Sequence, residues 1–521
     1  MVAYGGAAMM TKFFKLHPGQ LTLQQLKQLN HTKQPCQLAD ESLAAIEAAH
    51  ALVNTVVETG RTVYGINTGF GALAHCVIPP ADLTQLQKNI VLSHACGTGD
   101  LLDDNVVSTI LLLKINSLAQ GCSGIRLMVI EALLALYNNQ VYPCIPCKGS
   151  VGASGDLAPL AHLALPLLGY GEVRYHGKIL SAEEGLAIAG LKAISLGPKE
   201  GLALLNGLQA SAAVSIHAYW QAETLFQTAI VAGALSTDAV YGSDIPFDPR
   251  IHAIRGHAAQ SRVALQLQQL LAGSAIRESH RNCQRVQDPY SVRCQPQIMG
   301  AVRHQLDFIC DTLSVEVNAV TDNPLIFAEQ GDILSGGNFH GEMIAMAADN
   351  MALAIAEMGA ASERRIALLV DKEFSSLPAF LVKTSGIDSG FMLAHVTAAA
   401  CASDNKALAH PHVVDSLPTS ANQEDHVSMA MNAGRRLAPM LDNTATILAV
   451  ELLAACQGLE FHKPQQTSHL LQPIYEKVRA FVPAYEHDRY FAPDINVIKG
   501  AVLQGIFAYT PFCDALNKAT P

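Results

Sequence analysis

The residues with the clearest chemical potential lie in a glycine-rich stretch, Gly149-Ser-Val-Gly-Ala-Ser-Gly-Asp-Leu-Ala-Pro-Leu-Ala-His162. Gly152 and Gly155 bracket an Ala-Ser dipeptide, so the backbone can take conformations here that are closed to other residues. Asp156 near a cap position and Pro159 early in the next segment predict that a helix follows the loop. Taken alone, this pattern is equally typical of a Gly-rich strand-to-helix turn or of an anion site at a helix N-terminus.

The complete stretch resembles the signature of the aromatic amino acid ammonia-lyases, and the resemblance extends from about residue 18 to about residue 500. In that family an Ala-Ser-Gly tripeptide cyclises to 4-methylidene-imidazol-5-one (MIO), an electrophilic prosthetic group. The resemblance implies that Ala153, Ser154 and Gly155 form this group. The Gly155 nitrogen would attack the Ala153 carbonyl, and Ser154 would lose its hydroxyl. By capturing the substrate's amino group, MIO would turn it into a better leaving group.

Other motifs match further catalytic and substrate-binding positions of the family. Tyr64, in Tyr64-Gly-Ile-Asn-Thr-Gly-Phe-Gly71, matches the base at the substrate β-carbon, a role that requires positive surroundings to lower its pKa. Arg293 matches the residue that binds the substrate carboxylate, which suits a planar bidentate donor. The resemblance also assigns Tyr290 to catalysis, and Gln287, Asn206 and Phe339 to substrate binding.

Two positions bear on the choice of substrate within the family. His94 lies in Leu92-Ser-His-Ala95, a pattern that resembles the members acting on histidine. Glu424, in Asn422-Gln-Glu-Asp-His426, matches a catalytic-site carboxylate that those members place near the substrate ring. An imidazole offers one N–H donor and one nitrogen acceptor, so a carboxylate and a histidine together can satisfy both. A phenyl ring would leave Glu424 buried and unpaired, which costs several kcal/mol.

The resemblance therefore implies non-oxidative deamination of L-histidine to trans-urocanate and ammonia, a carbon–nitrogen lyase reaction. The alternatives within the family are a tyrosine or phenylalanine ammonia-lyase, or an MIO-dependent aminomutase that returns the amine to the β-carbon. An alternative of another class is a catalytically silent helical assembly protein. No metal or nucleotide cofactor is expected, because the sequence contains no HExxH motif, P-loop or GxGxxG that opens a helix after a strand.

Helical periodicity predicts a mainly α fold. Asp40 is the expected N-cap of a helix whose apolar stripe ends at Gly60, and a similar stripe follows Gly300. Two further segments, 341–371 and 438–458, contain few helix-breaking residues. Periodic stretches of this length are typical of a long-helix bundle.

Turn residues are denser in the first part of the chain, which suggests two regions with a soft boundary. Residues 1–200 are predicted to form a smaller, loop-rich N-terminal region that carries the prosthetic-group loop. Residues 201–521 are predicted to form the bundle and a C-terminal helical region, and together the two regions make one compact unit.

Composition narrows the class of protein. Half of the 521 residues are apolar, 15% are charged and the net charge is −11. These values argue against a disordered chain and against a nucleic-acid-binding protein. So few charges suggest one large core or an extensive subunit interface, and the resemblance implies a homotetramer whose active sites draw residues from three subunits.

The location of the protein is predicted from its cysteines and its N-terminus. Twelve cysteines in apolar surroundings indicate buried free thiols in a reducing compartment, here the cytoplasm. Residues 1–9 have no counterpart in the family and no pattern of a secretory signal. No membrane span is expected, because the most apolar windows, such as 157–168 and 128–137, are broken by Pro, His or Glu well short of roughly 18 residues. No membrane association is therefore predicted.

Overall fold

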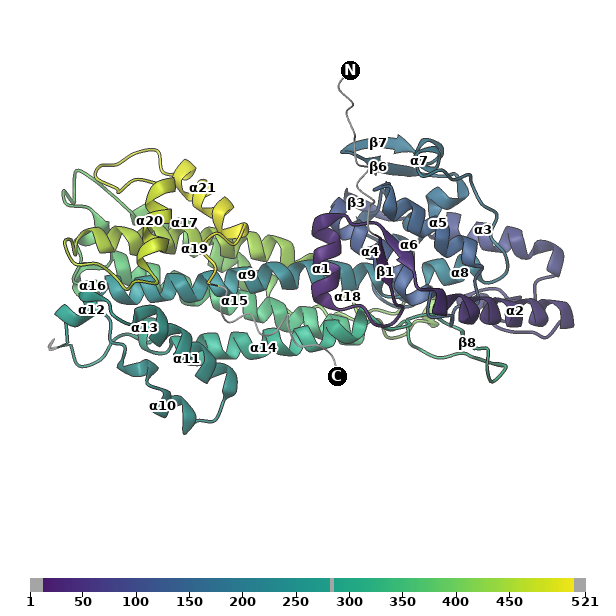
Figure 1. Ribbon diagram of the computed structural model, residues 1–521, viewed down its shortest axis with the longest axis horizontal. Helices are drawn as coiled ribbons and strands as arrows, with labels where there is room; N and C mark the ends of the chain where they lie inside the picture. The colour runs from purple at the N-terminus through teal and green to yellow at the C-terminus, as the bar shows by residue number, and fades with distance from the viewer. Residues whose placement is uncertain (1–12, 282–284, 510–521) are drawn as a thin grey trace, which may run out of the picture.

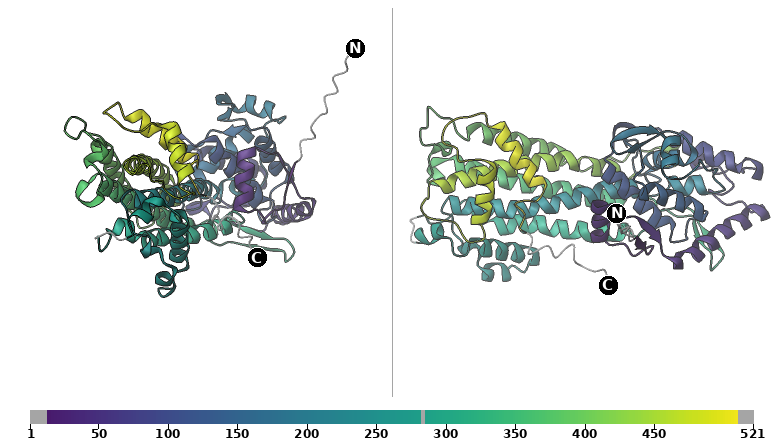
Figure 2. Two further views of the ribbon diagram at one scale, coloured as in Figure 1. Left: turned by 60° about the vertical axis from the view of Figure 1, so that its left-hand side comes forward. Right: turned by 45° about the horizontal axis from the view of Figure 1, so that its top comes forward.

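The computed structural model describes residues 13–281 and 285–509. Long helices lie side by side in an elongated bundle, and shorter helices and strands gather at one end of it (Figure 1; Figure 2). The predicted fold class, mainly α with a long-helix bundle, is confirmed. The predicted N-terminal extension, residues 1–9, lies outside the described residues.

The bundle is organised around one helix that is buried on all sides. The bundle helices are α9 (Gln209–Ala239), α11 (Ala258–Leu271), α14 (Gln295–Glu316), α15 (Glu342–Val370), α17 (Met392–Leu408), α18 (Ala430–Arg435) and α19 (Leu437–Glu460). Helix α9 packs against α14, α15, α18 and α19, and nearly all of its side chains are buried. The small residues of α9 allow its neighbours to approach closely on every side. Helices α15 and α19 confirm the two long predicted segments.

Shorter elements complete the molecule. At the N-terminal end lie helices α1 (Leu23–Thr32), α2 (Leu43–Thr59), α3 (Leu83–His94), α4 (Asp104–Leu118), α5 (Leu127–Asn138), α6 (Leu157–Ala164), α7 (Ala182–Ile188) and α8 (Glu200–Leu205). The other short helices are α10 (Pro249–Ala253), α12 (Ala275–Ser279), α13 (Tyr290–Arg293), α16 (Lys372–Ser375), α20 (Gln472–Phe481) and α21 (Ala492–Leu503).

Within residues 13–281 and 285–509 the strands form four small sheets. They are β1 (Phe14–Leu16), β2 (Cys36–Leu38), β3 (Thr98–Leu101), β4 (Tyr142–Pro143), β5 (Pro146–Lys148), β6 (Glu172–Tyr175), β7 (Lys178–Ser181), β8 (Leu325–Phe327) and β9 (Asp332–Leu334). Strands β1 and β2 pair in parallel, β4, β6 and β7 form one antiparallel sheet, and β3–β5 and β8–β9 are antiparallel pairs.

The hairpin β8–β9 shows that position along the chain does not decide which region a segment joins. Ile326 of β8 is buried in a small apolar cluster with Val53 of α2 and Ile66, and its N–H donates to the Cys122 carbonyl at 2.9 Å. A segment from beyond residue 201 therefore packs in the N-terminal region (Figure 1). The boundary at residue 200 stays a prediction.

One predicted helix start was wrong in detail. Asp40 is the first residue of a short 3-10 turn, and α2 begins at Leu43 behind Ser42. In the sequence Asp40 lies just before the apolar stripe, but in the structure one tight turn separates Asp40 from the first residue of α2. The helix ends as predicted, because Gly60 takes a left-handed conformation with φ 68°.

Two helical segments of the described chain are long and apolar enough to cross a membrane, judged by length and composition alone. They are Glu342–Val370 and Ala430–Glu460. The expectation that no apolar segment reaches this length was therefore wrong. In the apolar windows of these segments 61% and 72% of the residues are buried inside the protein, which is typical of core helices of a bundle.

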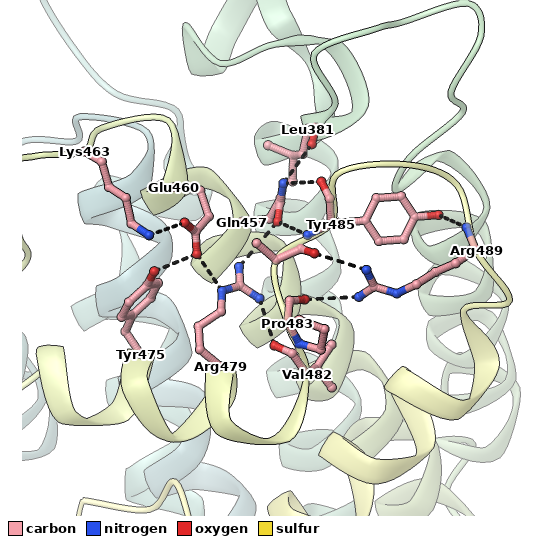
Figure 3. A network of polar contacts seen from close by, with 11 residues as sticks. Leu381, Gln457, Glu460, Lys463, Tyr475, Arg479, Val482, Pro483, Tyr485 and Arg489 are labelled. Atoms are coloured by element: carbon pink, nitrogen blue, oxygen red, sulfur yellow. Dashed lines mark hydrogen bonds and ion pairs between the residues drawn. The ribbon is translucent and has the colours of Figure 1, made fainter.

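The C-terminal segment is fastened to the end of α19 by a network of polar contacts (Figure 3). The Glu460 carboxylate accepts hydrogen bonds from the Tyr475 hydroxyl at 2.6 Å and from Arg479 Nε at 2.7 Å. Gln457 donates to the Tyr485 carbonyl and accepts from the Tyr485 N–H, both at 2.9 Å. These bonds satisfy buried backbone groups that leave the helical pattern, so they fix the chain's path after α20.

The cysteines of the described part of the chain form no disulfide bond, and not all of them are buried. Cys36, Cys144, Cys310 and Cys456 are buried, whereas Cys76 and Cys96 are exposed. The expectation of uniformly buried thiols was wrong for these last two, which lie on surface loops. Cys283 and Cys513 lie outside the described residues.

Candidate active site

The glycine-rich loop lies against a second backbone segment. Gly152 and Gly155 have φ values of 64° and 80°, the left-handed region predicted for them. Gly155 pairs with Gly207 as an isolated parallel bridge, and the Asp156 N–H donates to the Gly207 carbonyl at 2.7 Å. A side chain at Gly155 would collide with the Gly207 carbonyl oxygen. The two backbones can approach this closely because Gly155 has no side chain.

Asp156 precedes helix α6 but does not cap it with its side chain. Its carboxylate accepts hydrogen bonds from the Ser211 N–H at 2.7 Å, the Ser211 hydroxyl at 2.8 Å and the Ser150 hydroxyl at 3.0 Å. Burial raises the pKa of Asp156 against these stabilising bonds. The side chain therefore ties both sides of the loop to the first turn of α9.

Asn206 connects the loop to the end of helix α8. Its Nδ2 donates to the Ser154 carbonyl at 2.7 Å, while its Oδ1 is buried without a hydrogen-bond partner in the described residues. Buried polar atoms are nearly always paired in folded proteins. An unpaired acceptor beside the loop therefore marks a position where a further donor can bind.

Glu424 approaches the same loop from the other side. One carboxylate oxygen, Oε1, accepts from the Ser154 hydroxyl at 2.5 Å. The other, Oε2, accepts from the Thr419 hydroxyl at 2.7 Å and the Ser420 hydroxyl at 2.9 Å. Partial burial opposes ionisation, but the hydrogen bonds from these three hydroxyls lower the pKa of Glu424 below its usual value. Glu424 is thus a carboxylate at neutral pH.

The segment before Glu424 holds an uncommon backbone conformation. Ser420, Ala421 and Asn422 follow one another with positive φ values of 49°, 53° and 68°. Such angles are costly for residues with a side chain, and consecutive examples persist only where the surroundings enforce them. The turn brings the hydroxyls of Thr419 and Ser420 onto the Glu424 carboxylate, which lies five and four residues later, respectively.

His94 is the last residue of helix α3 and faces the same cavity. Burial lowers the pKa of His94, and the nearby Glu424 carboxylate opposes that shift. The Ser93 hydroxyl lies 3.0 Å from Nδ1 of the ring. A neutral imidazole can donate through one nitrogen and accept through the other.

A cavity of about 1110 Å³ brings most of the predicted site residues together. It is lined by Tyr64, His94, Ala153, Ser154, Asn206, Phe339 and Glu424. Gly155 lies directly behind this wall, against Gly207. The Tyr64 hydroxyl accepts a hydrogen bond from the Gly71 N–H at 3.3 Å, within its own loop.

The other three predicted residues lie elsewhere in the chain. Tyr290 and Arg293 are the ends of helix α13, and Gln287 precedes it. Helix α13 lies at the opposite end of the bundle from α3, α6 and α8 (Figure 1). Tyr290 is 67% exposed, and the Arg293 guanidinium stacks on its ring at 4.5 Å and donates through Nε to the Asp288 carbonyl at 2.9 Å. One chain alone does not bring these residues to the cavity.

The charges around the cavity are unbalanced. Among the described residues, its lining includes the acidic Glu424 and Asp425 but neither lysine nor arginine. An α-carboxylate bound in this cavity would therefore have no cationic side chain of the same chain to pair with. Charged groups are costly to bury without a partner, so an amino acid substrate requires a cation from outside this cavity wall.

Some residues of the cavity were not found from the sequence. Thr419 and Ser420 carry two of the three hydroxyls on Glu424, and His340 and His426 line the rim with their rings stacked at 5.9 Å. The hydroxyl pair just upstream of Glu424 was a usable signal, because Ser and Thr commonly bond to nearby groups in turns. The two histidines lie 86 residues apart, so no local pattern linked them.

No group of three or more His, Cys, Asp or Glu side chains in the described ranges is placed to hold a metal ion.

Comparisons with known proteins place the chain in a family. Residues 21–480 match the model of the aromatic amino acid lyase family. The chain is 66% identical over 499 residues to the histidine ammonia-lyase of Legionella pneumophila (strain Paris), covering 96% of this chain and 99% of that protein. The chain belongs to the aromatic amino acid lyase family and is a carbon–nitrogen lyase of the ammonia-lyase type.

Solved structures agree with this assignment. The crystal structure of histidine ammonia-lyase from Trypanosoma cruzi superposes with a TM-score of 0.87 at 38% identity, covering 97% of this chain and 96% of that chain. The phenylalanine aminomutase of Pantoea agglomerans superposes with a TM-score of 0.90 at 32% identity, covering 94% and 99%. One fold therefore accommodates both kinds of reaction, so the substrate must be argued from the cavity.

The contact between Gly155 and Gly207 predicts a difference between two glycine substitutions. Gly155 and Gly190 both have positive φ, 80° and 71°, but a side chain at Gly190 meets open space. Gly190→Ala should lower the free energy of unfolding by about 1 kcal/mol, the cost of a left-handed alanine. Gly155→Ala should lower it by about 3 kcal/mol or more, because the collision adds to that cost. Denaturant unfolding of both variants measures the difference, and equal losses would contradict the contact.

Proposed function

We propose that the protein removes ammonia from L-histidine to give trans-urocanate. The observation that carries this proposal is the pairing of Glu424 with His94 in one cavity beside the Ser154 loop. The carboxylate can accept the imidazole N–H, and the neutral His94 ring can donate to the other imidazole nitrogen. The 66% identical histidine ammonia-lyase supports the same substrate.

We also infer that Ala153, Ser154 and Gly155 condense to MIO, and the surroundings fit that group. Gly155 allows the close approach of the two backbones. The Asn206 amide donates to the Ser154 carbonyl, and its oxygen has no partner among the described residues. When formed, the group supplies an electrophile for the substrate's amino group.

The chain's own residues then have distinct tasks. Glu424 and His94 fix the imidazole ring, and Phe339 provides an aromatic wall. Tyr64 takes the proton from the substrate β-carbon, from a position in the same cavity. Arg293, assisted by Gln287, binds the α-carboxylate, and Tyr290 stands beside it in the catalytic arrangement. A fixed substrate orientation lowers the barrier because little freedom is lost in reaching the transition state.

These tasks require more than one copy of the chain. Among the described residues the cavity wall has no lysine or arginine, whereas the half-buried Arg293 stacks on the exposed Tyr290 ring at the far end of the bundle (Figure 1). We propose a homotetramer in which this end of one copy completes the cavity of another. The exposed apolar side chains along the bundle helices, including Met343, Met346 and Leu353 of α15, suit such an assembly. Location in the cytoplasm stays a prediction.

A tyrosine or phenylalanine ammonia-lyase, or an aminomutase, remains the competing function, since the fold is shared with an aminomutase. The cavity disfavours phenylalanine as a substrate, because a phenyl ring has no hydrogen-bond donor for the ionised Glu424. A phenol does have an O–H donor, so the assay with tyrosine decides between histidine and tyrosine.

The reaction is tested by supplying histidine, tyrosine and phenylalanine separately and following product absorbance in the ultraviolet. We expect turnover of histidine, and we expect Ser154→Ala to lower kcat by at least about 10³-fold. Circular dichroism should show that this variant is folded. Near-wild-type turnover by Ser154→Ala would remove the prosthetic group from the mechanism, and preferential turnover of tyrosine or phenylalanine would overturn the substrate.

Substrate recognition is tested by Glu424→Gln, which keeps the size of the side chain and removes its charge. We expect kcat/KM for histidine to fall by roughly 10- to 100-fold, the contribution of a charge-assisted hydrogen bond. Asp425→Asn removes the neighbouring charge and serves as the matched control, with a change of at most about threefold expected. An unchanged rate for Glu424→Gln would exclude the proposed contact with the substrate ring.

The shared site is tested by mixing two variants with lowered activity, Arg293→Ala and Glu424→Gln. If the two side chains of one site come from different copies, co-expression of the variants should restore activity in about a quarter of the sites, as random mixing in a symmetric oligomer gives. If both come from one copy, every site carries a defect and the activity of the mixture stays as low as that of its components. Each variant expressed alone provides the baseline.

A further inference from the structure

A buried lysine lies behind the loop and takes no part in the cavity. Lys114 sits in the middle of helix α4, and it is 1% exposed. Its Nζ donates to the backbone carbonyl of Asn206 at 2.7 Å. A buried ammonium group is costly unless it is paired. The burial of Lys114 against a neutral carbonyl therefore suggests that this contact has a structural or functional role.

Lys114 belongs to a buried group of four ionisable side chains. Lys199 pairs with Asp322 at 2.7 Å, and the charges of Asp322 and Asp156 act on Lys114. Burial lowers the pKa of Lys114 to about 7; the two carboxylates oppose this shift and the Lys199 charge adds to it. The charges of the two lysines and two aspartates balance when all are ionised. Among the described residues Lys114 therefore forms no ion pair, and its ammonium group is directed at the Asn206 carbonyl.

The carbonyl that Lys114 binds is part of the segment that presses on the loop. The Asn206 side chain donates to the Ser154 carbonyl at 2.7 Å. The next residue, Gly207, accepts the Asp156 N–H at 2.7 Å and lies against Gly155. One short segment thus contacts the second and third residues of the tripeptide and the residue after it.

We propose that Lys114 is a positioning residue for the condensation of the loop. Its bond to the Asn206 carbonyl fixes the segment 206–207, and that segment keeps the Gly155 nitrogen directed toward the Ala153 carbonyl carbon. This inference rests on the proposed function, because it concerns the formation of the proposed prosthetic group. Lys114 gains and loses no proton in it.

The chemistry that this contact assists balances without any co-reactant. A bond forms between the Gly155 nitrogen and the Ala153 carbonyl carbon. The former carbonyl oxygen leaves as water, with one proton from the Gly155 nitrogen and one from the Ser154 nitrogen. The Ser154 hydroxyl leaves as a second water with the proton from its own α-carbon. Small displacements of the attacking atom are costly in such a step, and this is why the segment behind the loop matters.

The test compares three versions of the full-length protein by intact mass at timed intervals after synthesis. Lys114→Met keeps an unbranched apolar side chain without a donor, and we expect the loss of two waters to be at least about tenfold slower. Lys114→Arg keeps a charged donor, and we expect it to condense faster than Lys114→Met. Circular dichroism and oligomer size report whether each variant is folded. If folded Lys114→Met condenses at the wild-type rate, or if both variants are slowed equally, the positioning role is overturned.

A second variant covers the case in which Lys114→Met does not fold. Lys114→Gln is neutral and one bond shorter than lysine, so its amide is drawn back from the Asn206 carbonyl, and we expect condensation at least about threefold slower than wild type. Condensation of Lys114→Gln at the wild-type rate would overturn the proposal. Failure of the proposed function looks different, because the wild-type protein itself would then keep the mass of an uncondensed chain.

Discussion

The close approach of two backbones, at Gly155 and Gly207, is the constraint on which the rest of the site depends. It depends on the absence of a side chain at Gly155, where a Cβ would collide with the Gly207 backbone. The surrounding contacts serve to keep it: Asp156 ties the loop to α9, and Asn206 bonds to the Ser154 carbonyl. Polar groups that are costly to bury are here satisfied by one another, so the loop has little freedom to relax.

The long helices explain why the site is divided. Helices α9, α15 and α19 run the length of the bundle, and the loop lies at one end while α13 lies at the other (Figure 1). Rigid helices of this length cannot fold back to bring their two ends together. A bundle of this shape therefore favours sites formed where the end of one copy meets the end of another.

Much of this could be predicted from the sequence, and the failures have physical causes. The segment 341–371 was recognisable as a helix because its apolar residues repeat with helical spacing over many turns. The start of α2 was misplaced at Asp40, since a tight turn leaves no periodic signal. The partners of Glu424 depend on three consecutive left-handed residues, which composition does not reveal. The position of Arg293 far from the cavity follows from the packing of the whole bundle, which no motif encodes.

The hydrogen bond between the Ser154 hydroxyl and Glu424 has a consequence for newly made protein. Oε1 of Glu424 accepts the hydrogen bond from the Ser154 hydroxyl, whereas the Thr419 and Ser420 hydroxyls donate to Oε2. Under the proposed chemistry, the elimination that removes the serine hydroxyl also releases Oε1. In a subunit that has not yet condensed, the Ser154 hydroxyl would thus block Glu424, the residue proposed to bind the substrate ring. The same condensation that forms the electrophile would free Glu424 for the substrate.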